Sequence, residues 1–236
     1  MLASAPISIP QYTPVNDLDS YLHQVDLTLS NLDLGFYHRH ASSLAQLKQT
    51  LVNLEVAHIK HTAIQQGIWD FYPTTQLVID KMMAIAHPQK NHYVLEPSAG
   101  AGDLARAIAL SGVNNLDCFE IHPLLQQALK LQGFNLIGDN FLTSTPRPVY
   151  DRILANPPFS NNGVARHTTH AFQFLKSGGR LVTLAHHYNL KPSSSDRSFF
   201  AWLQQNNARF LNLGSAFAQS DRTTHVPLQL IVIDKV

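Results

Sequence analysis

The spacing of the apolar residues changes once along the chain, at about residue 71. Before that point apolar residues recur every three or four positions, which is the spacing of amphipathic helices. Helices are expected over residues 16–35 and 42–67, with Gly35 and Gly67 as their ends. The second helix is expected to carry on one face Leu44, Leu47, Leu51, Leu54 and Ile59. Residues 1–68 are therefore predicted to form a helical N-terminal appendage that begins with an irregular, proline-containing segment.

After Phe71, short apolar runs alternate with helical patterns. The runs that indicate strands are His92–Glu96, Leu116–Ile121, Phe134–Ile137, Tyr150–Asn156, Arg180–His187, Arg209–Leu213 and Leu228–Asp234. Strands that alternate with helices imply a mostly parallel sheet covered on both faces. A helix over Asp196–Asn207 precedes the sixth strand, but none separates the last two, so a closing hairpin is expected. Residues 69–236 are predicted to form a Rossmann-like α/β domain: a seven-stranded, mostly parallel sheet with an antiparallel last strand.

The first predicted strand runs through a glycine loop into a helix, in the stretch "YVLEPSAGAGDLARAI". Gly100 and Gly102 allow a tight bend and a close approach of the backbone to a ligand. Ala105 completes a G-x-G-x-x-G/A pattern. The acidic Glu120 lies 18 residues beyond Gly102, as in a dinucleotide-binding site. An NAD site is therefore one interpretation of this loop, and a turn without a ligand is another.

Acidic residues stand at the carboxyl ends of three successive predicted strands. Glu96 could hold a cationic amino-acid group, Glu120 could accept from both hydroxyls of a ribose, and Asp139 could accept from an adenine amino group. Ile121 and Phe141 could enclose the base between them. S-adenosylmethionine combines these three chemical parts, so it is the cofactor that this pattern favours. Acids at strand ends that only cap helices remain the plain alternative.

The fourth predicted strand ends in the stretch "ILANPPFS". Proline cannot donate a backbone hydrogen bond and fixes its own φ, so Pro157 and Pro158 end the strand in a rigid corner. An amide, Asn156, and an aromatic ring, Phe159, flank the two prolines. A turn that only ends a strand is the plain interpretation of this corner when it is taken alone.

Taken in order, "EPSAGAG", "FEIHP", "GDNF" and "NPPF" resemble the motifs of class I S-adenosylmethionine-dependent methyltransferases that act on amino groups. The likeness runs from Phe71 to Val236 and is greatest to the adenine-N6 type found in phages and mobile elements. The upstream "DFYPTTQLVIDKM" resembles the F-x-T-P element of that family, with Thr75 where proline is usual. The resemblance implies a cofactor site made of Phe71, Thr74, Glu96, Pro97, Ser98, Gly100, Gly102, Glu120, Ile121, Asp139, Phe141 and Asn156.

The resemblance also implies the chemistry of the corner. The lone pair of an exocyclic amine is delocalised into its ring, and acceptors aimed at the amine hydrogens localise it as the new bond forms. The side-chain carbonyl of Asn156 and the backbone carbonyl of Pro157 are the implied acceptors, held in place by the two prolines. Phe159 is implied to stack on the target ring. The sulfonium is a good leaving group, so the reaction needs neither a metal nor a covalent intermediate.

The amine itself is left open by these motifs. Adenine in DNA is favoured, then RNA, while an rRNA guanine amine or a protein glutamine amide suits the same corner. Possible substrate contacts are His186, Lys191, Arg197 and Arg222, with Arg166, His167, His187 and His225 as further polar candidates. The N-terminal appendage is expected to cover the cleft or to bind a protein partner. A binding protein that keeps the cofactor pocket without turnover is the alternative from another class.

Composition narrows these interpretations only in part. The net charge of +1 gives no strong basic field, which weakens the case for duplex DNA, as does the lack of a target-recognition domain. The single cysteine, Cys118, excludes an internal disulfide and favours a reducing, cytoplasmic location. No apolar run approaches the roughly 20 residues of a membrane span. The 13 histidines, His38, His40, His58 and His61 among them, lack metal-ligand spacing, so no metal site is predicted.

Overall fold

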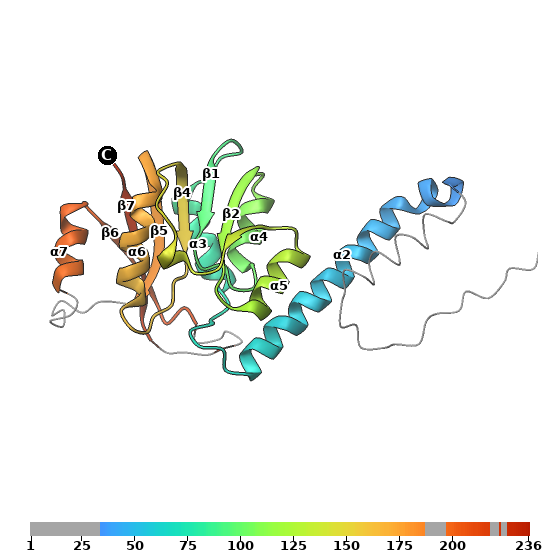
Figure 1. Cartoon of the computed structure of the whole chain (residues 1–236), viewed down its shortest axis with the longest axis horizontal. Helices are drawn as coiled ribbons and strands as arrows, with labels where there is room; N and C mark the ends of the chain where they lie inside the picture. Colours follow the sequence, from blue (N-terminus) through green and yellow to red (C-terminus); the bar gives the residue numbers. More distant parts are fainter. Residues whose placement is uncertain (1–33, 187–196, 218–221, 223–225) are drawn as a thin grey trace, which may run out of the picture. The chain divides into compact units, whose positions relative to one another are not determined.

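One seven-stranded sheet forms the centre of the C-terminal part of the chain (Figure 1). The structure, a computed structural model, describes residues 34–186, 197–217, 222 and 226–236. The strands lie in the order β3-β2-β1-β4-β5-β7-β6. Their bounds are β1 Tyr93–Glu96, β2 Asn115–Phe119, β3 Asn135–Gly138, β4 Tyr150–Ala155, β5 Leu175–His186, β6 Arg209–Gly214 and β7 Leu228–Asp234. Strand β7 is antiparallel to both of its neighbours, which confirms the predicted Rossmann-like sheet and its antiparallel last strand.

Helices cover both faces of this sheet. Successive side chains of a strand point to opposite faces, and in the central strands both sets are apolar. On β4, Leu154 packs with α3 and α4, whereas the preceding residue, Ile153, packs with α6 and α7 on the opposite face. The helices of the sheet unit are α3 Gln76–Ala86, α4 Asp103–Leu110, α5 Pro123–Leu131, α6 Gly163–Phe174 and α7 Arg197–Gln205, with a 3-10 turn, η1, at Phe141–Thr143. Central strands such as β4 and β7 are therefore buried on two sides and are nearly continuous apolar runs, whereas the edge strands β3 and β6 are more exposed.

Strand β5 begins earlier than predicted. The sequence places its start at Arg180, but Leu175 already pairs with Tyr150 on β4, and the register shifts before Arg152 pairs with Arg180. Glycine normally weakens a strand. Here Gly178 donates to the Lys235 carbonyl at 2.7 Å, and the Lys235 N–H donates to Gly179 at 2.9 Å. Pairing with Lys235, just beyond β7, therefore keeps this glycine-containing stretch within the strand, although Gly178 itself has φ +77°. The helix expected over 196–207 is confirmed as α7 within one or two residues at each end.

The chain divides into two compact units, residues 1–53 and 54–236. Helix α2, Leu34–Gln65, crosses this division and continues through Gly35, so Gly35 does not end a helix as predicted; residues 16–33 of the helix expected over 16–35 lie outside the described residues. The helix ends before Gly67 as predicted. The expected leucine face is buried only in part: Ile59 is buried, but Leu47 and Leu54 are 57% and 63% exposed, and the buried Val56 and Ala63 lie outside the expected set. Apolar residues occupy more than one face of α2, so their spacing alone could not identify the buried face. The boundary at residue 68 stays a prediction.

Strands β1 to β4 are mutually parallel, so their carboxyl ends meet at one edge of the sheet. The glycine loop follows β1, Glu120 follows β2, Asp139 follows β3 and Asn156 follows β4. The topology thus brings these four sequence motifs to one place. Among the residues that the structure describes, no helix has the length and apolar character to cross a membrane.

Candidate active site

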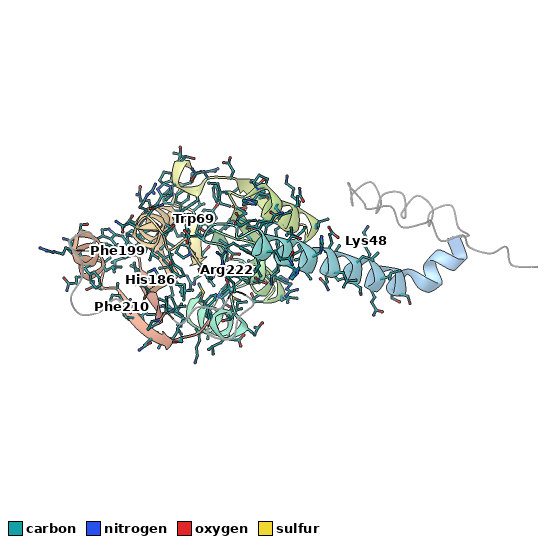
Figure 2. All side chains as sticks on the ribbon, turned by 90° about the horizontal axis from the view of Figure 1, so that it is seen from below. Lys48, Trp69, His186, Phe199, Phe210 and Arg222 are labelled. Carbon is teal, nitrogen blue, oxygen red and sulfur yellow. The ribbon has the colours of Figure 1, made fainter. Side chains whose placement is uncertain are left out.

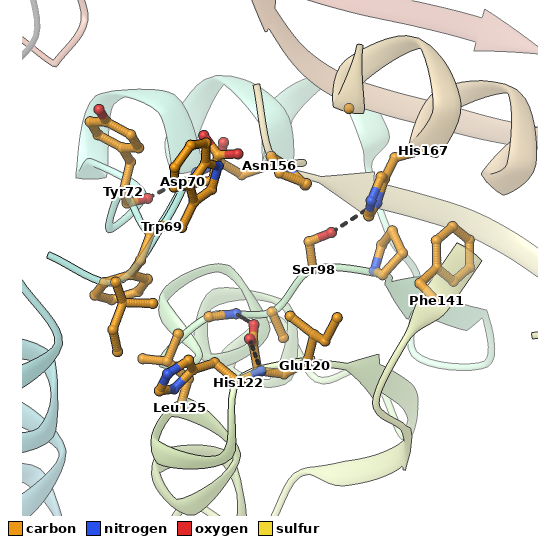
Figure 3. A pocket seen from close by; sticks show the side chains of 18 of the residues that line it. Trp69, Asp70, Tyr72, Ser98, Glu120, His122, Leu125, Phe141, Asn156 and His167 are labelled. Carbon is orange, nitrogen blue, oxygen red and sulfur yellow. Dashed lines mark hydrogen bonds between the residues drawn. The ribbon is translucent and has the colours of Figure 1, made fainter. Parts of the chain in front are cut away.

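A pocket of about 470 Å³ lies at this edge of the sheet (Figure 3). Its walls come from the loops after β1 to β4, from the start of α6, and from the segment that precedes α3. Many of the residues predicted from the sequence line it: Phe71, Thr74, Pro97, Ser98, Gly100, Glu120, Ile121, Asp139, Phe141, Asn156, Pro158, Arg166 and His167. The fold therefore gathers most of the proposed cofactor set in a single pocket.

The two glycines of the loop have different roles. Gly100 lines the pocket with φ +56°, and a Cβ on it would approach the Phe71 ring at 3.2 Å. Gly102, with φ +92°, lies behind the pocket as the residue that precedes α4. A Cβ on Gly102 would come within 2.9 Å of the Gln132 side chain. Only the first glycine allows close approach at the pocket surface, while the second allows α4 to pack closely.

Glu120 is held by the backbone on both sides. The Gly100 N–H donates to one carboxylate oxygen at 2.7 Å, and the His122 N–H donates to the other at 2.8 Å (Figure 3). Burial raises the pKa of this carboxyl, and the two N–H donors oppose that rise. Each oxygen keeps a further lone pair, so the fixed carboxylate can accept from two hydroxyl groups in the pocket.

Glu96 does not reach the pocket surface. Its side chain is buried, and Oε2 has no hydrogen-bond partner among the described residues. Burial and the nearby carboxylates of Asp103 and Glu120 raise the pKa of Glu96 well above its usual range. Asp103, which the sequence analysis passed over, lines the pocket instead and pairs with Lys60 at 2.7 Å. Its position one residue after the G-x-G pattern was the signal that could have found it.

An aromatic cluster supports the wall near Asp139. Phe141 lines the pocket but is almost completely buried, and its ring packs edge-on against Phe119 at 5.3 Å and His170 at 4.8 Å. His167 belongs to this wall, with Nδ1 at 3.2 Å from Ser98 Oγ. Burial lowers the pKa of His167 to about 4, so its ring is neutral near pH 7. It therefore cannot serve there as the cationic phosphate contact considered from the sequence.

Asn156 is fixed by the segment that precedes α3. Its side-chain nitrogen donates to the Tyr72 carbonyl and to Thr74 Oγ1, both at 3.1 Å. A backbone carbonyl can only accept, so this contact determines which end of the amide is the nitrogen. The oxygen is left as an acceptor in a residue that lines the pocket. Thr75, in the place of the usual proline, has φ −69°, a value that proline also adopts, so the backbone there is compatible with the family's residue.

The remaining corner residues are divided between pocket and core. Pro158 lines the pocket, whereas Pro157 is buried and is not among the lining residues. The Phe159 ring lies 4.5 Å from the His186 ring and packs against the core on both sides of the sheet. Neither Phe159 nor His186 lines the pocket that the described residues form. The stacking role of Phe159 thus stays a prediction that this arrangement does not favour.

Among the other predicted substrate contacts, the two that the structure describes, Arg197 and Arg222, are not part of the pocket lining. Arg197 begins α7, and Lys191, His187 and His225 fall outside the described residues. Arg222 donates to the carbonyls of Ile68 and Phe71 at 2.6 and 2.7 Å. Its guanidinium also lies 4.5 Å from the centre of the Tyr72 ring. The structure places Arg222 as a support of the pocket segment. No cluster of three potential metal ligands occurs in the described part of the chain.

A polar connection that the sequence patterns did not predict joins this segment to the corner. The Trp69 indole N–H donates to Ser160 Oγ at 2.7 Å, and the Ser160 N–H donates to Asp70 Oδ2 at 3.3 Å. The Ser160 hydroxyl donates to the same Asp70 oxygen. All three residues line the pocket. Their nearness in sequence to Phe71 and Phe159 was the available signal.

Comparison with known proteins gives the same fold. No protein-family model matches the chain. A stretch of 99 residues is 32% identical to the type II methyltransferase M.HincII of Haemophilus influenzae, which is 39% of this chain but only 17% of that relative. The modification subunit of a putative type I restriction enzyme from Vibrio vulnificus superposes with a TM-score of 0.61 at 17% identity, over 79% of this chain and 49% of that one.

A second solved structure agrees. The methyltransferase subunit of a type I restriction-modification system from Streptococcus thermophilus has a TM-score of 0.57 at 19% identity, over 70% of this chain and 44% of that one. This chain thus spans less than half the length of each of these proteins. The likeness confirms the resemblance to class I methyltransferases, and the fold is that of this class.

Proposed function

We propose that this chain is an S-adenosylmethionine-dependent methyltransferase that modifies DNA, at the N6 amine of adenine. The observation that carries the proposal is the fixed amide of Asn156. Its nitrogen is engaged by Tyr72 and Thr74, which leaves its oxygen as an acceptor beside the glycine loop and Glu120. An acceptor held in place before the reaction is what transfer to a delocalised amine needs.

The pocket fits the cofactor by its volume and its acceptors. About 470 Å³ lies within the usual range of small-ligand sites. Glu120 offers two oriented oxygens for a ribose diol, and Asp139 lines the pocket where an adenine amine can be met. Gly100 keeps the wall open, because any side chain there would press on Phe71. When bound, S-adenosylmethionine supplies an activated methyl group on a positively charged sulfur.

The residues of the chain act by alignment. Asn156 Oδ1 accepts a hydrogen of the amine and draws its lone pair away from the ring. The Pro157 carbonyl, the second acceptor that the resemblance implies, belongs to a residue outside the pocket lining. The two prolines remove backbone freedom from this corner, so the acceptors need no reorganisation as charge develops. His167 stays neutral and holds its place in the aromatic wall, and no proton transfer is assigned to it.

DNA is favoured over the other acceptors by the relatives. Both solved structures are named as parts of type I restriction systems, and the curated relative is a type II methyltransferase, classes of enzyme that modify DNA. The adenine N6 position rests on the "NPPF" corner and its resemblance to that family. RNA, an rRNA guanine and a protein glutamine present amines of the same kind, and they are distinguished by the test below.

The test offers methyl-labelled cofactor with single- and double-stranded DNA, total RNA and a protein extract, followed by digestion and mass spectrometry. Label on N6-methyladenine in DNA is expected. In Asn156→Ala the rate should fall at least about 100-fold, the scale of losing one oriented acceptor or donor, while calorimetry shows the cofactor still bound. Asn212→Ala, on exposed strand β6, is the matched control and should keep full activity. Retained turnover in Asn156→Ala would contradict the proposal. Cofactor binding without transfer to any substrate would support the binding-protein alternative.

A further inference from the structure

We propose that Trp69 is a stacking surface for a base of the nucleic acid at the mouth of the pocket, an inference that rests on the proposed nucleic-acid substrate. Trp69 lines the pocket, yet its side chain is 76% exposed (Figure 3). A large apolar ring exposed beside an active-site pocket is suited to binding a planar ligand, because such surface gains by removal from water.

The ring is exposed but held in one orientation. Its N–H donates to Ser160 Oγ at 2.7 Å, and Ser160 is bonded twice to Asp70, the next residue along the chain from Trp69. Asp70 itself has φ +56°, a left-handed conformation that is costly for a residue other than glycine. Ile68, the residue before Trp69, accepts a hydrogen bond from Arg222 through its carbonyl oxygen at 2.6 Å. A side chain fixed in this way loses little freedom when a ligand stacks on it.

The position of the ring matches the place of a methyl acceptor. Ser160 directly follows Phe159, the last residue of the "NPPF" corner, so the Trp69 contact is made to the same loop that carries Asn156. Phe159 packs against His186 and the core, so in this wall Trp69 is the aromatic residue that faces the solvent-exposed side. The adenine end of the cofactor is assigned to the opposite wall, near Asp139 and Ile121.

The chemistry of the neighbours favours a nucleic-acid base. Bases present a flat π-face to an aromatic side chain, whatever their identity. A glutamine amide, the protein substrate considered above, has no ring to stack. Arg166, exposed on α6 and part of the same pocket lining, can meet a phosphate of the strand that carries the base. The pocket lining thus combines a ring on which a base can stack, an amine acceptor and a cation.

The experiment measures binding separately from turnover. The chain has two tryptophans, and Trp202 packs against Phe172 and Phe199, so Trp202→Phe leaves Trp69 as the fluorescent reporter. Single-stranded oligonucleotides that contain adenine are titrated into this variant with Asn156→Ala added, so that no product forms. Quenching of Trp69 is expected. In the wild-type background, Trp69→Ala should weaken oligonucleotide binding, measured by anisotropy, by about 5- to 100-fold, the range found for loss of one stacked base.

Two further variants test whether the ring of Trp69 itself is what binds the oligonucleotide. Trp69→Phe keeps a ring and should restore most of the affinity. Phe210→Ala removes another exposed ring, 49% exposed on β6 and not among the pocket-lining residues, and should have no effect (Figure 2). Unchanged oligonucleotide binding in Trp69→Ala overturns the inference, and so does a larger loss of cofactor affinity than of oligonucleotide affinity. Oligonucleotide binding that depends on Trp69 without any methyl transfer would support the stacking surface and contradict the proposed function.

Discussion

The two sides of the pocket are built in different ways. On the glycine side, residues 96–122, the Glu120 carboxylate accepts from Gly100 and His122, which lie in the same short stretch of chain. On the corner side, residues 156–163, the partners of Asn156 and Ser160 lie more than 80 residues earlier, in the segment of residues 68–74. The glycine side is therefore a local structure, and the corner side forms only when the whole fold brings distant segments together.

This difference separates the two roles that the proposed methyltransferase site must fill. The glycine side can hold its carboxylate with few contacts from elsewhere, which suits a cofactor subsite. The corner side fixes acceptors and rings by contacts between loops, which suits the alignment of a substrate. The two sides meet where Gly100 faces the Phe71 ring, so that a change in one can be tested for its effect on the other.

Gly163→Ala should disrupt the corner side and should lower turnover more than any other substitution considered below. A Cβ on Gly163 would lie 2.2 Å from the Pro158 carbonyl oxygen, so the corner itself must move. A misplacement of about 1 Å can lower a rate on the order of 100-fold, and we expect at least that loss in turnover. Calorimetry should show cofactor affinity within a few-fold of the wild type, because the Glu120 contacts are not touched.

The control for this variant is Gly112→Ala. Gly112 has φ +89°, but a Cβ there meets no described atom within 4 Å. This change should lower the melting temperature through backbone strain and leave turnover per folded molecule unchanged. Full turnover in Gly163→Ala would show that the corner geometry is not needed.

The same difference explains what could be predicted from the sequence. The strands and the glycine loop follow from local patterns, and the "NPPF" corner was found because prolines dictate their own backbone. The direction of the Phe159 ring could not be predicted, since packing against His186 decides it. The Trp69–Ser160 contact joins residues 91 positions apart, and no local pattern encodes it. Arg222 was assigned to substrate because a loop arginine gives no sign that backbone carbonyls are its partners.

Glu120→Gln should disrupt the glycine side and should lower cofactor affinity by an intermediate amount. The amide keeps one acceptor, but its NH₂ group faces an N–H donor and the charge is lost. Hydrogen bonds to charged groups contribute about 1.5–3 kcal/mol, so we expect cofactor affinity to fall on the order of 10- to 100-fold. At saturating cofactor, turnover should recover to near the wild-type rate, which Gly163→Ala cannot do.

The pH dependence of cofactor binding tests the same carboxylate. Burial raises the pKa of Glu120, and binding needs its ionised form, so wild-type affinity should fall with decreasing pH at values above those where an exposed glutamate titrates. The charged groups His122, Asp103 and Glu96 lie nearby in both proteins, so the quantity to compare is the difference between wild type and Glu120→Gln. An equal pH profile in the two proteins would assign the titration to another group.

Arg222→Ala should have the smallest effect and should touch both sides at once, because Arg222 holds the segment that carries Phe71 and supports Asn156 through Tyr72. We expect a loss of cofactor affinity on the order of 10-fold, the lower end of the scale of one charge-assisted hydrogen bond, because Arg222 acts on the cofactor only through the segment that it supports. Arg222→Lys should recover little, since an ammonium cannot donate in a planar fork and stack on Tyr72 together. Salt titration of oligonucleotide binding separates this support role from a phosphate contact. A support leaves the slope of log affinity against log salt unchanged, whereas loss of a phosphate contact lowers it by about one.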